Sequence, residues 1–232
     1  MTDSSYGGSP KHPKGKAKEK NDTHVKVLAI GAHPDDIELG LGGCLAKHVQ
    51  EGDNVYILIF SRGEKGVRND KIKNKGKMRE VETKKALKFL GVKEENIKIL
   101  GLPDGGIKSD ERVTREVDAH IKEINPDVIY THFFEDDHLD HVNVSLITLH
   151  AGRKVKNVLF YESPSTRASF SPNYFVDISE YVQKKVEALK RHRTQKEKSY
   201  MKEDVIISKA RFRGFQAKVK YAEGFMIYRW VK

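Results

Sequence analysis

Histidine and aspartate residues gather at two places in the sequence, in a pattern typical of a metal site. His33 and Asp36 lie three residues apart, and His141 closes a second polar run that starts at His132. Three such ligands leave one position of a tetrahedral metal open for water, which is the arrangement of catalytic rather than structural zinc. The same donors also bind iron, cobalt or nickel, so the residue types indicate a transition metal without deciding which one.

Asp35 stands beside these predicted ligands and has a different expected role. A metal lowers the pKa of a bound water toward neutrality, and a neighbouring carboxylate can then take up its proton. Asp35 is therefore a candidate general base. Two other interpretations stay open: His33 and Asp36 could cap the helix that follows, and residues 136–138 could form a solvated acidic loop.

Alternating strands and helices are expected to position these clusters. Apolar runs predict strands at 25–30, 55–60, 97–100, 127–131 and 157–161, and helical spacing predicts helices at 37–50, 77–90, 111–124 and 141–150. A further strand at 174–178, a basic helix at 179–193 and a final strand at 225–230 complete the pattern. This alternation predicts an α/β fold with a parallel, doubly wound sheet.

Polar, titratable clusters follow four of these predicted strands. They occupy residues 31–36, 61–66, 102–106 and 132–141. Ligands of open α/β sheets bind outside the carboxyl ends of the strands. We therefore expect the four clusters to share one site.

The glycines and the cysteine near the first cluster suggest no further chemistry. A dinucleotide-binding turn has glycine in the turn itself, where this chain has His33 and Asp35. The glycines here follow several residues later, at Gly40, Gly42 and Gly43. We therefore expect them to let the helix pack closely on the sheet. Cys44 is the only cysteine, which excludes an intramolecular disulfide. Its place in the predicted helix favours a core position over a nucleophile.

Composition limits the possible classes of protein. The 232 residues are 38% hydrophobic and carry a net charge of +10, with no apolar run near the ~20 residues that cross a bilayer. Residues 1–23 are predicted to be a disordered basic tail, because they lack Ile, Leu and Phe. Residues 24–232 are predicted to form one domain. No apolar stretch typical of a secretory signal follows the basic start, and we expect a cytoplasmic protein.

The positive charge supports a rival interpretation as a non-catalytic protein that binds nucleic acid or another polyanion. The tail and residues 184–202 would supply the cations, although Glu187 and Glu197 interrupt the second stretch. The sequence has no signature of a known nucleic-acid-binding fold, so this function is not the expected one.

The motifs resemble a known family. Residues 32–43, AHPDDIELGLGG, are similar to the first signature of the LmbE/PIG-L family of metal-dependent N-deacetylases, and residues 138–142, HLDHV, are similar to its second. The resemblance extends from about residue 25 to residue 225. It implies a Rossmann-like fold with a mostly parallel sheet and helices on both faces. It also implies hydrolysis of an N-acetyl group from an N-acetylglucosamine-type sugar. As substrates, we expect small conjugates or chitooligosaccharides rather than a membrane glycolipid. Another amide remains an alternative substrate.

Residue roles follow from this resemblance by position. The implied Zn²⁺ ligands are His33, Asp36 and His141. The implied catalytic residues are Asp35 as the general base, His138 as the group that stabilises the oxyanion or protonates the departing amine, and Asp140 as the partner that orients His138. The implied sugar-binding residues are Glu64, Arg79 and Asp104. Many members have proline where this chain has Leu139, and many relatives assemble, so a homo-oligomer is expected.

Overall fold

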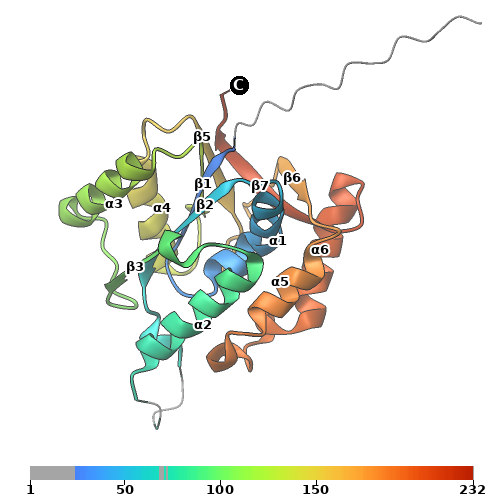
Figure 1. The fold of residues 1–232 in the computed structure, drawn as a ribbon, viewed down its shortest axis with the longest axis horizontal. Helices are drawn as coiled ribbons and strands as arrows, with labels where there is room; N and C mark the ends of the chain where they lie inside the picture. Colours follow the sequence, from blue (N-terminus) through green and yellow to red (C-terminus); the bar gives the residue numbers. More distant parts are fainter. Residues whose placement is uncertain (1–23, 68–70, 72, 232) are drawn as a thin grey trace, which may run out of the picture.

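A seven-stranded sheet forms the centre of the computed structural model, which describes residues 24–67, 71 and 73–231 (Figure 1). The predicted tail, residues 1–23, lies outside the described residues. The strands are β1 (Lys26–Gly31), β2 (Asn54–Ser61), β3 (Ile97–Leu102), β4 (Val128–His132), β5 (Asn157–Tyr161), β6 (Tyr174–Asp177) and β7 (Ala222–Arg229). Their order across the sheet is β3-β2-β1-β4-β5-β7-β6.

The sheet has a parallel part and an antiparallel part. Strands β3, β2, β1, β4 and β5 run parallel to one another, whereas β7 runs antiparallel to both β5 and β6. The mostly parallel, Rossmann-like sheet is therefore confirmed.

Helices cover both faces of the sheet. They are α1 (Asp36–Gln50), α2 (Lys75–Leu90), α3 (Glu111–Ile124), α4 (Leu139–Ala151), α5 (Val182–Leu189) and α6 (Glu203–Ala217). In β1, Val27 and Ala29 pack toward α1 and α2, whereas Leu28 and Ile30 pack toward α3 and α4. This alternation of side chains along the strand is what buries both faces. Helices α5 and α6 lie beside α1 and β7 (Figure 1).

Local signals in the sequence explain the helix that is most clearly amphipathic, α3. Asp110 caps it by accepting a hydrogen bond from the Val113 N–H at 2.9 Å. Val113, Val117 and Ile121 recur every four residues and face the core. Asn125 ends the helix in the left-handed conformation, with φ of 49°.

The glycines of α1 have the packing role that the sequence suggests. A Cβ atom at Gly40 would collide with the ring of Tyr161, and one at Gly43 would lie 2.8 Å from Ile178. Helix α1 can therefore approach β5 and the segment after β6 only because these side chains are absent. Cys44 is fully buried in the core beside them.

The C-terminal part of the chain differs most from the expectation. The predicted basic helix at 179–193 is observed only at Val182–Leu189, because the chain then turns inward to bury His192. Helix α6 has no counterpart in the prediction. Its buried positions, Ile206, Ala210 and Gly214, form a narrow stripe in a polar sequence.

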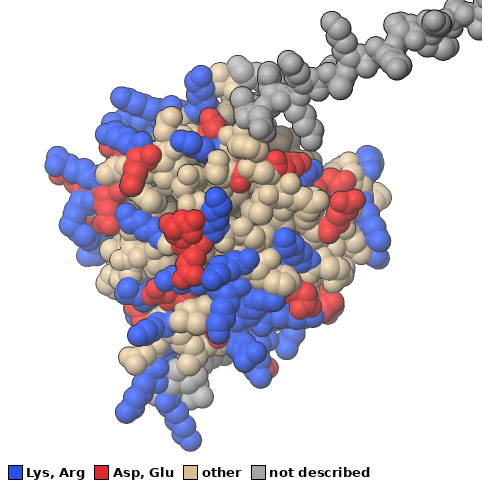
Figure 2. Space-filling view, viewed as in Figure 1, with Lys and Arg blue, Asp and Glu red and all other residues tan. Residues whose placement is uncertain are grey.

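Positive charge spreads over the surface and is densest over α2 and α5 on the face in Figure 2. A shallow hollow there is lined by Lys85, Lys88, Phe89, Lys190, Arg191 and Arg193. Part of this charge is compensated, because Lys190 pairs with Glu187 at 2.7 Å and with Glu203 at 3.0 Å. Among the described residues, no helix has the length and apolar character needed to cross a membrane.

Candidate active site

The polar loops after β1 and β4 meet at one edge of the sheet. These two strands are neighbours, and the chain proceeds from β1 to β2 and β3 on one side and from β4 to β5 on the other. A reversal of strand order of this kind leaves a crevice at the carboxyl ends of the two strands. A cavity of about 540 Å³ lies there.

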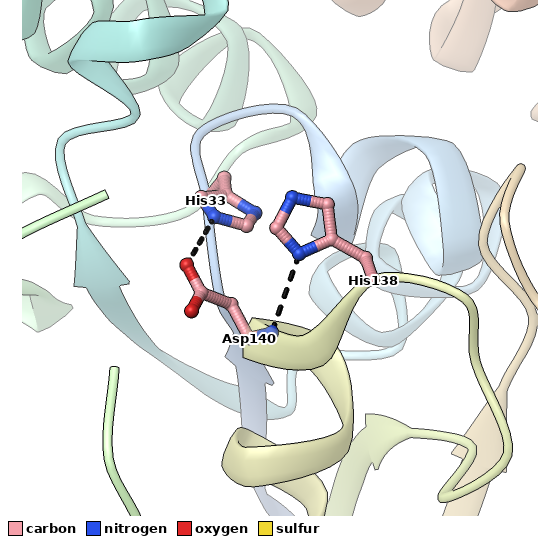
Figure 3. A group of neighbouring side chains, drawn as sticks. All are labelled: His33, His138 and Asp140. Carbon is pink, nitrogen blue, oxygen red and sulfur yellow. Dashed lines mark hydrogen bonds and ion pairs between the residues drawn. The ribbon is translucent and has the colours of Figure 1, made fainter. Parts of the chain in front are cut away.

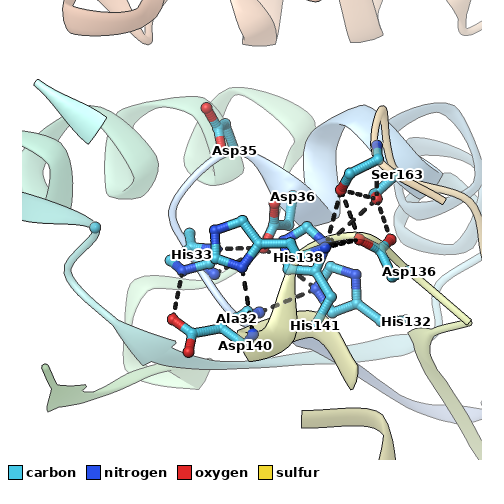
Figure 4. Close-up of polar contacts among 12 residues, drawn as sticks. Ala32, His33, Asp35, Asp36, His132, Asp136, His138, Asp140, His141 and Ser163 are labelled. Carbon is cyan, nitrogen blue, oxygen red and sulfur yellow. Dashed lines mark hydrogen bonds and ion pairs between the residues drawn. The ribbon is translucent and has the colours of Figure 1, made fainter. Parts of the chain in front are cut away.

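The three predicted metal ligands converge in this crevice (Figure 4). Nδ1 of His33 lies 3.4 Å from Oδ2 of Asp36, and Nε2 of His141 lies 3.5 Å from the same oxygen. All three residues are buried, and one ligand atom from each lies within 4.8 Å of the other two. Two imidazole nitrogens and a carboxylate oxygen that face one point fit a divalent transition metal.

Carboxylates lie behind both histidines. Nε2 of His33 is 3.1 Å from Oδ2 of Asp140 and 3.3 Å from Oδ1 of Asp104, and Nδ1 of His141 is 3.2 Å from Oδ1 of Asp136. Histidines that ligate metals usually donate their second ring nitrogen to such a group, which fixes the ring and its tautomer. The surroundings of the two rings therefore also fit a metal site.

These carboxylates are held in the ionised form. Burial acts to raise the pKa of Asp136, but hydrogen bonds with His141 and Ser165 and the charge of His141 hold it well below its usual range. Burial also opposes ionisation of Asp104, whereas its hydrogen bond and charge interaction with His33 lower its pKa to about 2. Both groups can thus accept hydrogen bonds from the histidines at neutral pH.

The two interpretations left open by the sequence can be compared with these positions. Oδ2 of Asp36 accepts a 2.7 Å hydrogen bond from the backbone N–H of His33, which precedes α1, so it closes the turn and does not cap the helix. The Asp35 side chain stands at the N-cap position without a capping hydrogen bond. Asp136 is buried whereas Asp137 is exposed, so the acidic run is only partly a solvated loop.

Asp35 lies in the cavity wall next to the predicted ligands. Its φ of 92° places it in the left-handed region, which is strained for a residue other than glycine. Its side chain is buried, and Oδ2 lies 3.2 Å from Nη2 of Arg79. Burial raises the pKa of Asp35 to about 6, although the charge of Arg79 acts in the opposite direction. A carboxylate tuned to this range suits proton transfer near neutral pH.

Arg79 ties the Asp35 turn to the loop after β2. Its guanidinium donates to the carbonyl oxygens of Pro34 and Gly63. Gly63 has a φ of 63°, and a Cβ atom there would collide with the guanidinium. Arg79 lines the cavity, and its role in sugar binding stays a prediction.

The other two predicted sugar-binding residues, Asp104 and Glu64, hold the loop that follows β3. Asp104 lines the cavity and accepts a hydrogen bond from the Lys65 N–H at 2.8 Å. Glu64 accepts one from the Asp104 N–H at 3.0 Å, but it is not part of the cavity lining. Glu64 is thus placed to act through Asp104.

His138 lines the cavity beside His33 and Asp140 (Figure 3), next to the predicted metal ligands (Figure 4). Its ring stacks on His141, with centroids 4.6 Å apart, and its Nδ1 accepts a hydrogen bond from the Asp140 backbone N–H at 3.3 Å. The Asp140 carboxylate contacts His33, and it also accepts hydrogen bonds from the N–H groups of Gly105 and Ile107. The contact between Asp140 and His138 is therefore made by the Asp140 backbone, and its carboxylate supports a predicted metal ligand.

The sequence predicts no role for His132, yet His132 contacts the predicted ligands Asp36 and His141. Its Nε2 accepts a hydrogen bond from the Ala32 N–H at 3.1 Å and lies 3.2 Å from Oδ2 of Asp36. Its ring stacks on His141, with centroids 4.0 Å apart. Burial, reinforced by the charge of His141, lowers the pKa of His132 to about 4, so the ring is neutral. His132 is the last residue of the buried strand β4, and this position in the sequence could have indicated that it lies at the site.

A distant segment, residues 192–195, also supports the site. His192 forms a fully buried 2.9 Å contact with Glu38 of α1, and Thr194 donates two hydrogen bonds to Glu82 of α2. Gln195 lines the cavity and lies 3.4 Å from the carbonyl oxygen of Gly66. These contacts join residues more than 110 positions apart, so no local pattern in the sequence could reveal them.

Comparisons with known proteins agree with this geometry. The sequence profile of the family PIG-L, described as GlcNAc-PI de-N-acetylase, matches residues 28–152. The uncharacterized deacetylase YaiS of Escherichia coli K12 is 34% identical over 173 residues, which are 72% of this chain and 90% of that protein. A diacetylchitobiose deacetylase of Thermococcus kodakarensis is 26% identical over 73% of this chain and 70% of its own length.

A solved structure shows the same architecture. The conserved protein TT1542 of Thermus thermophilus superposes with a TM-score of 0.78 and 26% identity, over 90% of this chain and 96% of that one. The family match spans β1 to α4, the part of the chain that supplies the three predicted metal ligands. The chain belongs to the PIG-L family.

Proposed function

We propose that the chain is a metal-dependent deacetylase that removes the acetyl group from an N-acetylglucosamine-type amino sugar or a conjugate of one. The observation that carries this proposal is the convergence of His33, Asp36 and His141 beside the buried Asp35, in a cavity of small-molecule size. The deacetylases among the relatives support the class of reaction.

Zinc or another divalent transition metal would be held by His33, Asp36 and His141. When bound, it would act as a Lewis acid toward the acetamide carbonyl and would make a water molecule more acidic. The donor set and the carboxylates behind both histidines support this assignment.

Asp35 accepts the proton of the attacking water in this proposal. Its raised pKa lets it take up and release a proton near neutral pH. Arg79 contacts the carboxylate and fixes the turn on which Asp35 stands. Attack of the water on the acetyl carbon then leads to acetate once the sugar nitrogen has gained a proton and the C–N bond breaks.

His138 is oriented as a hydrogen-bond donor. Because its Nδ1 accepts from the Asp140 N–H, the proton of the neutral ring stays on Nε2. Burial lowers the pKa of His138, which favours this neutral form, and a metal held by His33 and His141 would add positive charge that acts in the same direction. An Nε2–H group at the cavity wall can stabilise the developing oxyanion or the departing nitrogen.

The function can be tested by measuring acetate release from purified, metal-loaded protein. The panel contains N-acetylglucosamine, N,N'-diacetylchitobiose and, as a different amide, an N-acetylated amino acid. We expect acetate from the sugars and little from the amino acid. Acetate from the amino acid alone would favour the alternative amide hydrolase, and no acetate from any compound would contradict the proposal.

A further inference from the structure

A second cavity, of about 370 Å³, lies between α6, β7 and the N-terminal part of α1. It is separate from the crevice at the carboxyl ends of β1 and β4. Its apolar walls are formed by Leu39, Pro164, Val205, Ile206 and Ala210. The reaction proposed above uses no charged group of this cavity.

The two cavities adjoin each other. Leu39, Pro164 and Tyr200 line both of them. These three side chains form a wall common to both cavities, and a substituent on a ligand whose acetamide lies beside Asp35 would enter the second cavity past them. The substituent of an amino sugar that varies among conjugates is the group on its anomeric carbon.

Two of the three cations in the second cavity are fully paired. Lys185 lies 2.7 Å from Oε1 of Glu223, with both side chains almost completely buried. Arg213 makes two parallel hydrogen bonds of 2.8 Å to Glu162. Pairs with this geometry are specific and leave little charge for a ligand.

Lys209 is the third cation, and each carboxylate of the cavity lining is already paired with another cation. Its Nζ lies 3.8 Å from Oε1 of Glu162, an oxygen that Arg213 already occupies, and 3.4 Å from the Glu162 backbone oxygen. Three cations thus face two carboxylates, which leaves one positive charge. The Lys209 side chain is 38% exposed. Desolvation by its neighbours lowers its pKa to about 8, so the amine is still mostly protonated at pH 7 and can pair with an anion in the cavity.

We propose that the second cavity is a subsite for a small anionic group, a carboxylate or a phosphate, carried by the conjugated part of the amino-sugar substrate. Lys209 supplies the counter-charge, and the apolar walls pack against the carbon atoms that join the anion to the sugar. The inference rests on the proposed deacetylase function and adds a substrate class to it.

The test compares three glycosides of N-acetylglucosamine that differ in the anomeric group. The 2-hydroxyethyl glycoside is neutral, the carboxymethyl glycoside has similar size and carries a carboxylate, and the 1-phosphate carries a phosphate. For each, kcat/KM is measured by acetate release. We expect wild type to prefer at least one anionic compound over the neutral one by about tenfold. The preferred compound identifies the anion.

Variants assign this preference to Lys209. The anion preference is kcat/KM for the preferred anionic compound divided by kcat/KM for the neutral compound. Lys209→Met is expected to lower this ratio by about tenfold, mainly by raising KM for the anionic compound. Lys209→Arg is expected to retain most of the ratio. Lys218→Met, at the end of the same helix and outside both cavity linings, is the matched control and should retain it fully. Thermal unfolding checks that each variant folds.

Two outcomes overturn the inference and differ in what else they contradict. If wild type and Lys209→Met cleave the glycosides with the same ratio, the subsite is wrong while the deacetylase function stands. If wild type with metal releases acetate from none of the compounds, the proposed function fails and the subsite fails with it.

Discussion

The parallel and antiparallel parts of the sheet use their buried polar residues differently. At the carboxyl ends of β1 and β4, buried histidines and aspartates of residues 31–36 and 132–141 face a cavity and contact one another, and Asp104 and Arg79 add contacts from other segments. In the C-terminal part, buried polar residues reach back to α1 and α2. Glu223 accepts hydrogen bonds from the N–H groups of Gly43 and Cys44, and His192 contacts Glu38.

We infer that the first region carries the chemistry and that the C-terminal part holds the structure around it. The Glu223 contacts occur just after Leu41, where the helical backbone of α1 is interrupted with φ of −143°. The interruption frees N–H groups that a helix would otherwise bond internally, and Glu223 satisfies two of them. The C-terminal part thus fixes the helix that begins with Asp36. Changes in the first region should therefore affect turnover or metal binding, and changes in the second should affect stability or substrate preference.

The largest effect is expected at Asp35. Asp35→Asn keeps the shape of the side chain but removes its ability to accept a proton, and we expect kcat for acetate release to fall by about 10²–10⁴. Metal content measured by mass spectrometry should remain near that of wild type. A kcat within a few-fold of wild type would show that another group is the base.

A change in the supporting region should act on stability. Lys185→Met leaves the Glu223 carboxylate buried without its cation, and we expect the free energy of unfolding to fall by about 3 kcal/mol in urea titrations. Lys184→Met, at the neighbouring and less buried position, is the control, with an expected change within about 0.5 kcal/mol. Equal losses in the two variants would contradict the role of the buried pair.

A smaller effect is expected at Asp136, the carboxylate next to the predicted metal ligand His141. Asp136→Asn removes the charged acceptor of His141, and we expect metal affinity to fall by about 10- to 100-fold in competition with a chelator. Asp137→Asn changes the exposed neighbouring carboxylate and should leave affinity unchanged. If both variants bind metal as tightly as wild type, the carboxylate does not tune this ligand.

The smallest effect is expected at Leu139, the position at which the resemblance to the second family signature implies proline. Leu139 is exposed at the first position of α4, a position that accepts proline, and the preceding His138 has an extended backbone with φ of −90° and ψ of 112°. Leu139→Pro should therefore change the free energy of unfolding by less than about 1 kcal/mol. A loss above about 2 kcal/mol would show that the Leu139 side chain or N–H has a specific role.

The sequence was sufficient to predict the parallel part of the fold because its signals are local. Each strand from β1 to β5 is a short apolar run, and the polar residues after β1 and β4 marked the crevice. The rule that ligands bind at the carboxyl ends of strands then predicts that His33, Asp36 and His141 converge.

The remaining features depend on contacts between distant segments. The Asp140 carboxylate contacts His33, 107 positions away, whereas the resemblance implies His138 as its partner. Both histidines belong to the same site, and only the orientation of the Asp140 side chain decides between them. Helix α6 and residues 192–195 gain their place from tertiary contacts, because their own apolar patterns are weak. Assembly into a homo-oligomer, a cytoplasmic location and the single domain at 24–232 stay predictions.

Metal removal and reconstitution test the central claim most directly. The protein is treated with a chelator, dialysed, and assayed for acetate release from N,N'-diacetylchitobiose before and after addition of zinc or cobalt. We predict that activity is lost on chelation and returns with metal in wild type, whereas His141→Ala does not recover at the same metal concentration. Full acetate release by the metal-free protein would contradict the assignment of the His33, Asp36 and His141 cluster as the centre of the reaction.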